Sequence, residues 1–336
     1  FLKAILVLTD SQLLVAGNIL SDDIVLARCH FDGSLDDAFA QNGFIISDFG
    51  SNLLTPGRIQ HTTDGRILAS VAMSNKIAVV RYLPNGAIDN SFGTQGRAFI
   101  RVPPYLIPGY PTISTDAQGR ILAISTVTEP LGGVTHIYIM RFHADGTPDS
   151  QFGNSSFVIV NFGLEASFLN ALEVLEDGKM LLAGTFFPDT GGKRPGIVRL
   201  LPNGQPDSTF GNSGVALGPP FLASGCSTML VQSDGKIVLA GTRSNTPDTP
   251  VYVFRFLADG SMDTAFGSDG VAEVYPPDGW PEPHCLLSQS DGKIVLGGNT
   301  NGFALLTRLH PDGSLDTGFG SSGFFQNPSL TGAVQQ

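Results

Sequence analysis

An all-β fold, the six-bladed β-propeller with four antiparallel strands per blade, is what this sequence predicts, and three observations support it. One unit of roughly 56 residues recurs six times along the 336 residues. Each copy contains short apolar runs separated by Asp-Gly or Asn-Gly turns. If the two ends of the chain were joined, they would complete one more connection of nearly the usual length.

The composition is that of a globular, turn-rich protein. Hydrophobic residues make up 42% and charged residues 15%, with 41 Gly and 22 Pro. The formal net charge of −11 argues against nucleic acid and anionic membrane surfaces as partners. No apolar run approaches the roughly 18 residues of a membrane helix, so we expect no membrane insertion.

A first signature opens on an arginine. The six arginines follow one another at intervals of 53, 60, 58, 56 and 53 residues: Arg28, Arg81, Arg141, Arg199, Arg255 and Arg308. Five residues after each arginine comes a Gly preceded by Asp or Asn, a pair that suits the positive φ angles of tight turns. Three residues after each Gly comes an aspartate: Asp36, Asp89, Asp149, Asp207, Asp263 or Asp316. A phenylalanine follows after three more residues, as in Phe266.

A second signature lies between the copies of the first. It places an Asp-Gly turn before a fully apolar run, most clearly after Asp177, Asp234 and Asp291. An uninterrupted apolar run predicts a strand covered on both faces, as in a propeller blade that packs between two neighbours. In the fifth copy the four strands are expected at residues 226–232, 236–241, 251–256 and 270–274.

The ends of the chain favour a closed arrangement. About 20 residues separate the last Gly of one signature from the next Asp-Gly turn, and the 13 residues after Gly323 together with the first ten supply 23. We therefore expect a single domain, 1–336, closed by pairing of the two terminal segments. The chain begins with Phe1 rather than Met, and we expect a processed or trimmed form.

The two signatures together resemble the bacterial delta-sixty repeat family of propeller-like repeats, and more distantly the NHL repeat. The resemblance covers essentially the whole chain. It departs from the pattern at Ala40 and Ser156, where Gly is the usual residue, and at Ser11 and Ser70. It implies a bacterial protein that is secreted, periplasmic or on the cell surface. It implies no particular chemistry.

Residues present in all six copies are expected to build the fold. We interpret the six arginines and six aspartates as repeated ion pairs, and the phenylalanines as plugs between blades. We expect no cofactor. Calcium bound by Asp32, Asp36 and Asp37 is an alternative, although their spacing lacks the alternating ligands of an EF-hand loop.

Function is expected where the copies differ. In the strand before each Asp-Gly turn, the second copy carries Arg58, Gln60 and His61, the third carries Ser114 and Asp116, and the fourth carries Glu173. If that strand lines the axis, these groups form a polar site, with Glu173, His61 and Arg58 as the catalytic candidates of a hydrolase or lyase.

Two Pro-rich connections supply further candidate ligand-binding residues. One connection leads to Trp280 and His284, and the other contains Tyr105 and Tyr110. Exposed aromatic rings would suit stacking on a sugar or anchoring a protein partner.

Three hypotheses follow. The first is a non-enzymatic, secreted or surface-exposed propeller that binds a protein or carbohydrate through loops on one rim. The second is the hydrolase or lyase with an axial site, although the sequence holds none of the common local catalytic motifs. The third is a passive scaffold unit cut from a larger surface protein.

Overall fold

The computed structural model describes residues 2–8, 12–18, 24–40, 42–47, 55–73, 75–103, 107–109, 111–128, 135–153, 156–160, 165–188, 192–220, 225–242, 249–277, 281–300 and 303–331. Within these ranges every regular element is a β-strand. Two compact units divide the chain, one built on residues Phe1–Asn161 and the other on Phe162–Leu175 and Lys179–Val334.

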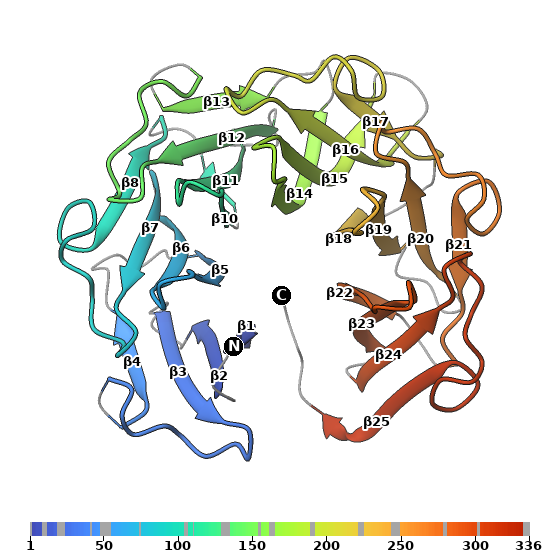
Figure 1. The fold of residues 1–336 in the computed structure, drawn as a ribbon, viewed down its shortest axis with the longest axis horizontal. Helices are drawn as coiled ribbons and strands as arrows, with labels where there is room; N and C mark the ends of the chain where they lie inside the picture. The colour runs from blue at the N-terminus through green and yellow to red at the C-terminus, as the bar shows by residue number, and fades with distance from the viewer. Residues whose placement is uncertain are drawn as a thin grey trace. The chain divides into compact units, whose positions relative to one another are not determined.

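The first unit holds three antiparallel sheets, which we call blades 1 to 3 (Figure 1). Blade 1 consists of β1 (Leu2–Val7), β2 (Gln12–Asn18), β3 (Ile24–His30) and β4 (Phe44–Ser47). Blade 2 consists of β5 (Thr55–His61), β6 (Ile67–Met73), β7 (Lys76–Tyr82) and β8 (Arg97–Arg101). Blade 3 consists of β9 (Ile107–Pro108), β10 (Thr112–Thr115), β11 (Ile121–Thr128), β12 (Thr135–Phe142) and β13 (Phe157–Val160). The extra strand β9 pairs with β11 beside β10.

The second unit holds blades 4 to 6. Blade 4 consists of β14 (Glu165–Val174), β15 (Met180–Phe187), β16 (Arg194–Leu200) and β17 (Val215–Leu217). Blade 5 consists of β18 (Gly225–Val231), β19 (Ile237–Thr242), β20 (Val251–Phe256) and β21 (Val271–Val274). Blade 6 consists of β22 (Pro281–Ser288), β23 (Ile294–Thr300), β24 (Phe303–Leu309) and β25 (Phe324–Thr331). The fifth copy thus has its four strands within about one residue of the predicted bounds.

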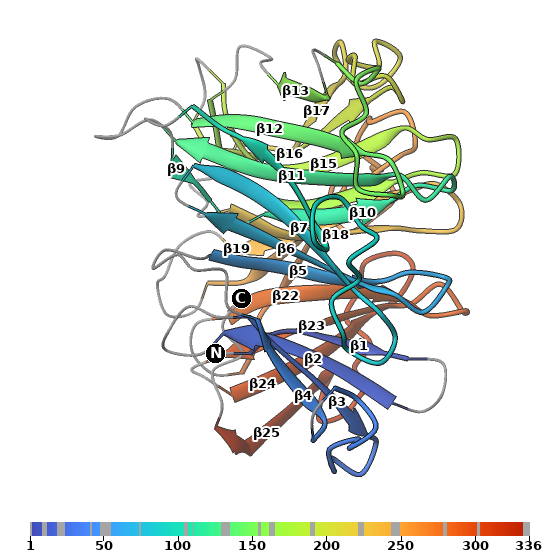
Figure 2. The ribbon, with the colours of Figure 1, turned by 90° about the vertical axis from the view of Figure 1, so that its left-hand side faces the viewer.

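The fold class is the predicted six-bladed β-propeller. Each blade has four antiparallel strands paired in chain order, and blade 3 has β9 in addition. Figure 2 shows β5, β6 and β7 side by side along their length. Because neighbouring strands run in opposite directions, each blade has two distinct ends. The signature end carries the turn between the first and second strands and the connection between the third and fourth. The variable end carries the other two connections, which differ most in length and sequence.

Contacts within each unit show which strands of neighbouring blades lie against each other. Within the first unit β1 lies against β5 and β5 against β10, and within the second unit β14 lies against β18 and β18 against β22. The first strand of each blade therefore lies against the first strand of its neighbour, and the fourth strand forms the far edge.

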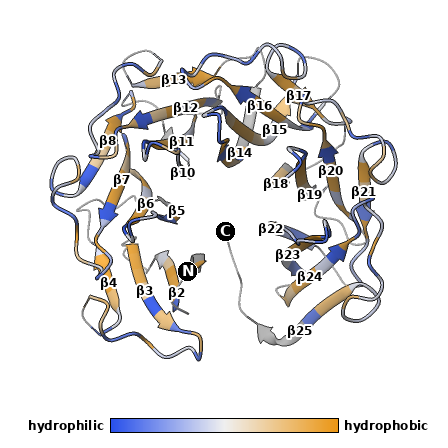
Figure 3. Cartoon of the chain, in the orientation of Figure 1, coloured by the Kyte–Doolittle hydropathy of each residue, from blue (hydrophilic) through white to orange (hydrophobic). Residues whose placement is uncertain are grey.

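The core lies between neighbouring blades. In blade 5, β20 is buried along its whole length, and every described residue of β15 except the last is buried. One apolar cluster joins blades 1 and 2, a second joins blades 2 and 3, and two more join blades 4, 5 and 6. Burial on both faces explains why these strands are uninterrupted apolar runs, and Figure 3 shows hydrophobic residues along the strands and hydrophilic ones in the connections.

The signature phenylalanines plug these junctions. Phe266 has no exposed surface, and a side chain on Gly313 of the next blade would lie 3.0 Å from its ring. The Asp-Gly turn therefore needs glycine for close approach as well as for its φ of +89°.

Two departures from the repeat keep the backbone of the glycine that they replace. Ala40 has a φ of +52° and Ser156 a φ of +85°, both in the left-handed region. Ser70 has another role: its hydroxyl donates to the carbonyl of Pro111 in blade 3 at 3.0 Å. Ser11 lies outside the described residues.

The terminal strands complete their own blades. β1 pairs with β2, and β25 pairs with β24. The expectations of a single domain and of pairing between the terminal segments stay predictions. No described segment forms a helix long and apolar enough to cross a membrane.

Candidate functional site

The six signature arginines occupy equivalent places near the ends of the third strands. In each blade the guanidinium Nε donates to the aspartate eight residues later at 2.7–2.9 Å. The same guanidinium lies 4.3–4.9 Å from the ring of the signature phenylalanine. In four blades the Nη1 of this arginine also donates to a backbone carbonyl of the following blade, as in Arg255 to Pro311 at 2.5 Å. Arg308 Nη1 instead lies 3.5 Å from Gln289 Oε1 of its own blade. In those four blades the arginine fastens its turn to the next blade.

The signature aspartates are held in their ionised form. Burial opposes ionisation of Asp263, but the charge and hydrogen bond of Arg255 outweigh it and lower the pKa of that carboxyl. At Asp316 the hydrogen bond from Lys293, helped by Arg308, lowers the pKa to about 2. Repeated ion pairs of this kind are building elements, so a functional site has to be sought elsewhere.

Two of the three proposed calcium ligands already have protein partners. Asp32 accepts hydrogen bonds from the amide and hydroxyl of Ser34, and Asp36 accepts from Arg28 and Gln12. Asp37 is exposed. Calcium binding stays a prediction.

The predicted axial residues fall on the first strands, in both units. Exposed Arg58 and half-buried His61 lie on β5, while exposed Glu173 lies on β14 of the other unit. The catalytic grouping of these three stays a prediction.

The polar candidates of blades 2 and 3 meet at the contact of β5 with β10. Gln60 Nε2 donates to Thr115 Oγ1 at 2.8 Å, next to half-buried Ser114. Asp116 forms an ion pair with Arg120 at 2.6 Å and accepts hydrogen bonds from two backbone amides of its own turn. Both of its oxygens are therefore used to hold that turn.

The first strands of blades 4, 5 and 6 share a bulge, which sequence comparison did not reveal although it singled out His284. In blades 4 and 5 the residue at the bulge bonds to the backbone of the next blade, Asn170 to Cys226 O at 2.5 Å and Ser227 to Pro283 O at 2.6 Å. In blade 6 the same position belongs to His284, where the register shifts between Pro283 and Cys285. The regular spacing of 57 residues between these three positions is a signal that could have found it.

At this bulge in blade 6, three polar side chains form a cluster, Glu282, His284 and Asn299. Asn299 Nδ2 lies 3.1 Å from Glu282 Oε2 and 2.9 Å from His284 Nε2. Glu282 Oε2 and His284 Nε2 are themselves 4.0 Å apart. Glu282 and Asn299 face each other across β22 and β23. The carboxylate of Glu282 is 62% exposed, whereas the imidazole of His284 is 15% exposed.

The cluster has a defined protonation pattern. Burial lowers the pKa of His284 against the opposing effect of Glu282, so the ring is neutral at pH 7. The Asn299 amide group donates one hydrogen to Glu282 and one to His284, which places the imidazole proton on Nδ1. The cluster therefore offers the exposed carboxylate of Glu282 and the amide oxygen of Asn299.

No other described blade of the second unit has this set. Blade 5 carries Gly225, Ser227 and Thr242 at the corresponding places. The cluster lies at the variable end, directly after the connection that leads from β21 into blade 6. Tyr275 starts this connection with a side chain 58% exposed, and its hydroxyl donates to Glu273 at 2.6 Å. Trp280, Tyr105 and Tyr110 lie outside the described residues.

The cysteines of the described chain are free thiols. Cys226 is buried, and burial raises its thiol pKa to about 12, while Cys285 on β22 is exposed.

Comparison with known proteins agrees with the fold. Five segments, residues 62–92, 118–152, 175–210, 232–266 and 289–319, match the family described as "Domain of unknown function (DUF5122) beta-propeller". No curated protein matches the sequence significantly.

Solved structures resemble the chain in fold. An inactive variant of virginiamycin B lyase from Staphylococcus aureus has a TM-score of 0.53 at 13% identity, over 98% of this chain and 84% of the lyase. A protein from Lactobacillus plantarum has a TM-score of 0.54 at 12% identity, over 91% and 80%. Prolyl oligopeptidase B from Galerina marginata has a TM-score of 0.50 at 12% identity. The match covers 98% of this chain but only 44% of that enzyme. At such identities the likeness shows the fold alone.

Proposed function

Because the chain belongs to the DUF5122 β-propeller family, we propose that it is a non-enzymatic binding protein that recognises a carbohydrate through the variable end of blade 6. The observation that carries the proposal is the cluster of Glu282, His284 and Asn299, three polar side chains that meet at one bulge.

The chemistry of the cluster suits sugar hydroxyls. A hydroxyl both donates and accepts a hydrogen bond, and neighbouring hydroxyls of a pyranose are matched by planar side chains that do both. Glu282 accepts hydrogen bonds, and the Asn299 amide, whose Nδ2 is shared by Glu282 and His284, has an oxygen that accepts another. A small set of convergent polar groups is typical of small-ligand sites.

A location outside the cytoplasm would fit this role. We therefore propose that the protein is secreted, periplasmic or on the cell surface of a bacterium, as the family resemblance implies. The hydrolase or lyase built on Arg58, His61 and Glu173 stays the alternative.

A glycan array followed by titration calorimetry tests the proposal. A glycan that binds the wild-type chain should bind Asn299→Ala at least about tenfold more weakly, because the accepting amide oxygen is lost. His284→Ala should also weaken binding, because it removes the ring that holds the Asn299 amide. Thr242→Ala, the matched change in blade 5, should bind like the wild type. An array without any ligand, or variants that all keep full affinity, would show the proposal to be wrong. A hydrolase or lyase activity lost in Glu173→Gln would favour the alternative.

A further inference from the structure

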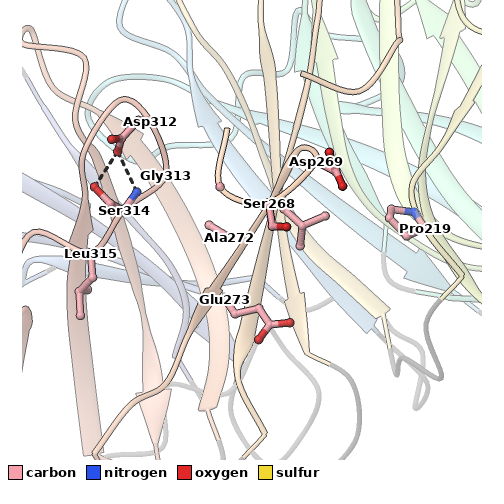
Figure 4. A pocket seen from close by; sticks show the side chains of 11 residues that line it. Pro219, Ser268, Asp269, Ala272, Glu273, Asp312, Gly313, Ser314 and Leu315 are labelled. Atoms are coloured by element: carbon pink, nitrogen blue, oxygen red, sulfur yellow. Dashed lines mark hydrogen bonds between the residues drawn. The ribbon is translucent and has the colours of Figure 1, made fainter. Parts of the chain in front are cut away.

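A groove runs along the far edge of blade 5, away from the cluster in blade 6. It has a volume of about 670 Å³ and is open to solvent along β21. Its walls come from four segments of the second unit: Pro219 after β17, the loop around Ser268 and Asp269, the strand β21, and the turn of blade 6 around Asp312 and Ser314 (Figure 4). Buried Ala272 forms part of its floor.

The backbone of β21 is arranged to accept another strand. β21 is the last strand of its sheet. Val271 exchanges two hydrogen bonds with Ser268, at 2.7 and 3.1 Å, on the side away from β20. Because every second residue of a strand directs its N–H and C=O to the same side, Glu273 presents both groups to the groove. Within the described residues, neither of them makes a backbone hydrogen bond outside the sheet.

The groove carries negative charge. Asp269, Glu273 and Asp312 line it, and no Lys or Arg is among its lining residues. Hydrogen bonds from the Ser314 hydroxyl and amide lower the pKa of Asp312, so this carboxyl is ionised at neutral pH. Glu273 and Asp269 are both exposed.

Two of these three carboxylates, Asp269 and Glu273, are specific to the fifth copy. At the position of Asp269 the other copies have Asn42, Gln95, Ser155, Ser213 and Ser322, and at the position of Glu273 they have Ile46, Phe99, Ile159, Leu217 and Gln326. The repeat architecture therefore requires neither carboxylate.

We propose that this groove binds an extended peptide with basic side chains, which adds to β21 as a fifth strand. The backbone of Glu273 supplies the first hydrogen-bonding pair, and alternate Lys or Arg side chains of the peptide face Asp269, Glu273 and Asp312. Two residues further along the same edge, the exposed ring of Tyr275 gives a surface for the aliphatic part or the charge of the next basic residue. The partner is thus a basic segment of another protein.

Fluorescence polarisation with a labelled hexapeptide of alternating Lys and Val tests the proposal on the whole chain. Binding is expected to weaken about tenfold in the double variant Asp269→Asn, Glu273→Gln, which removes two exposed charge contacts. The control Asp37→Asn, Glu176→Gln removes the same charge at exposed turns outside the groove and should change affinity less than about twofold.

Two further comparisons separate strand addition from attraction by charge alone. Glu273→Pro also removes the outward N–H, which an edge strand tolerates, and it should bind more weakly than Glu273→Gln. A peptide with N-methylated valines should bind more weakly than the parent peptide. Equal binding of a Glu-Val peptide, or equal effects of the groove and control variants, would overturn the proposal. Equal affinity of Glu273→Pro and Glu273→Gln would overturn strand addition.

Discussion

Replacing Arg255 with Met tests the idea that the signature arginines fasten neighbouring blades. Arg255 and Asp263 are both buried, with side chains 6% and 8% exposed, and their Nε to Oδ2 distance is 2.8 Å. The same guanidinium donates to Pro311 O of blade 6 and lies 4.3 Å from the ring of Phe266. Methionine keeps the aliphatic length of the side chain and removes all three contacts.

The expected loss follows from these contacts. Removing one partner of a buried ion pair costs about 3–5 kcal/mol, because the other charge stays buried. Lys236 remains 3.5 Å from Asp263 and compensates part of this charge, so we expect about 3 kcal/mol for Arg255→Met. Arg255→Lys keeps the charge but not the forked geometry, and it should cost about 1–2 kcal/mol.

Urea unfolding followed by circular dichroism measures these losses. Arg308→Met is the matched comparison, because Arg308 is 23% exposed and Lys293 lies 3.1 Å from Asp316. It should therefore cost less than Arg255→Met. A free energy of unfolding for Arg255→Met within about 0.5 kcal/mol of the wild type, the range of an ordinary surface substitution, would refute the reasoning.

Three other predictions concern stability. The pKa of Asp316 is about 2 in the folded chain against an ordinary 3.8, so its stabilising effect is complete above pH 3.8 and is lost as the pH falls toward 2. The midpoint of urea unfolding should therefore drop mainly between pH 4 and 2.5. A midpoint that does not change over that range would contradict this prediction. Ser156→Gly should stabilise the chain by about 1 kcal/mol, because glycine adopts the φ of +85° without strain. The control Ser156→Ala keeps the strain, so it should not raise the thermal unfolding temperature. Tyr82→Phe should lower the free energy of unfolding by about 1 kcal/mol, because the buried hydroxyl donates to Ser47 Oγ at 2.8 Å. A double-mutant cycle with Ser47→Ala checks this bond. If the two losses were fully additive, the bond would contribute nothing.

The repeat architecture could be predicted because its signals are local. An Asp-Gly pair sets the turn, an apolar run sets the strand after it, and the arginine lies eight residues before its aspartate. The Arg255–Asp263 pair therefore lies within one strand and the connection that follows it. The strand bounds of the fifth copy were close to the observed ones for the same reason.

The polar sites could be predicted only in part. His284 was singled out because its connection differs from the other copies, but its partner Asn299 lies 15 residues away on the next strand. Their contact depends on a bulge, which shifts the register of β22 against β23, and apolar periodicity does not encode such a shift. Asp116 was expected to face a ligand because it is polar, yet Arg120 and two amides of its own turn hold both oxygens.

By itself, the sequence determined the number of blades, the strands within each blade and the residues that repeat as ion pairs and plugs, since each of these follows from short-range spacing. Tertiary structure alone decided which strand of a blade lies against its neighbour's first strand, and which odd residues meet. Asp269 and Asp312 line one groove although 43 residues separate them, because the turn of one blade packs beside the edge strand of the blade before it. Contacts between blades depend on how whole sheets pack, and no local pattern in the chain records that packing.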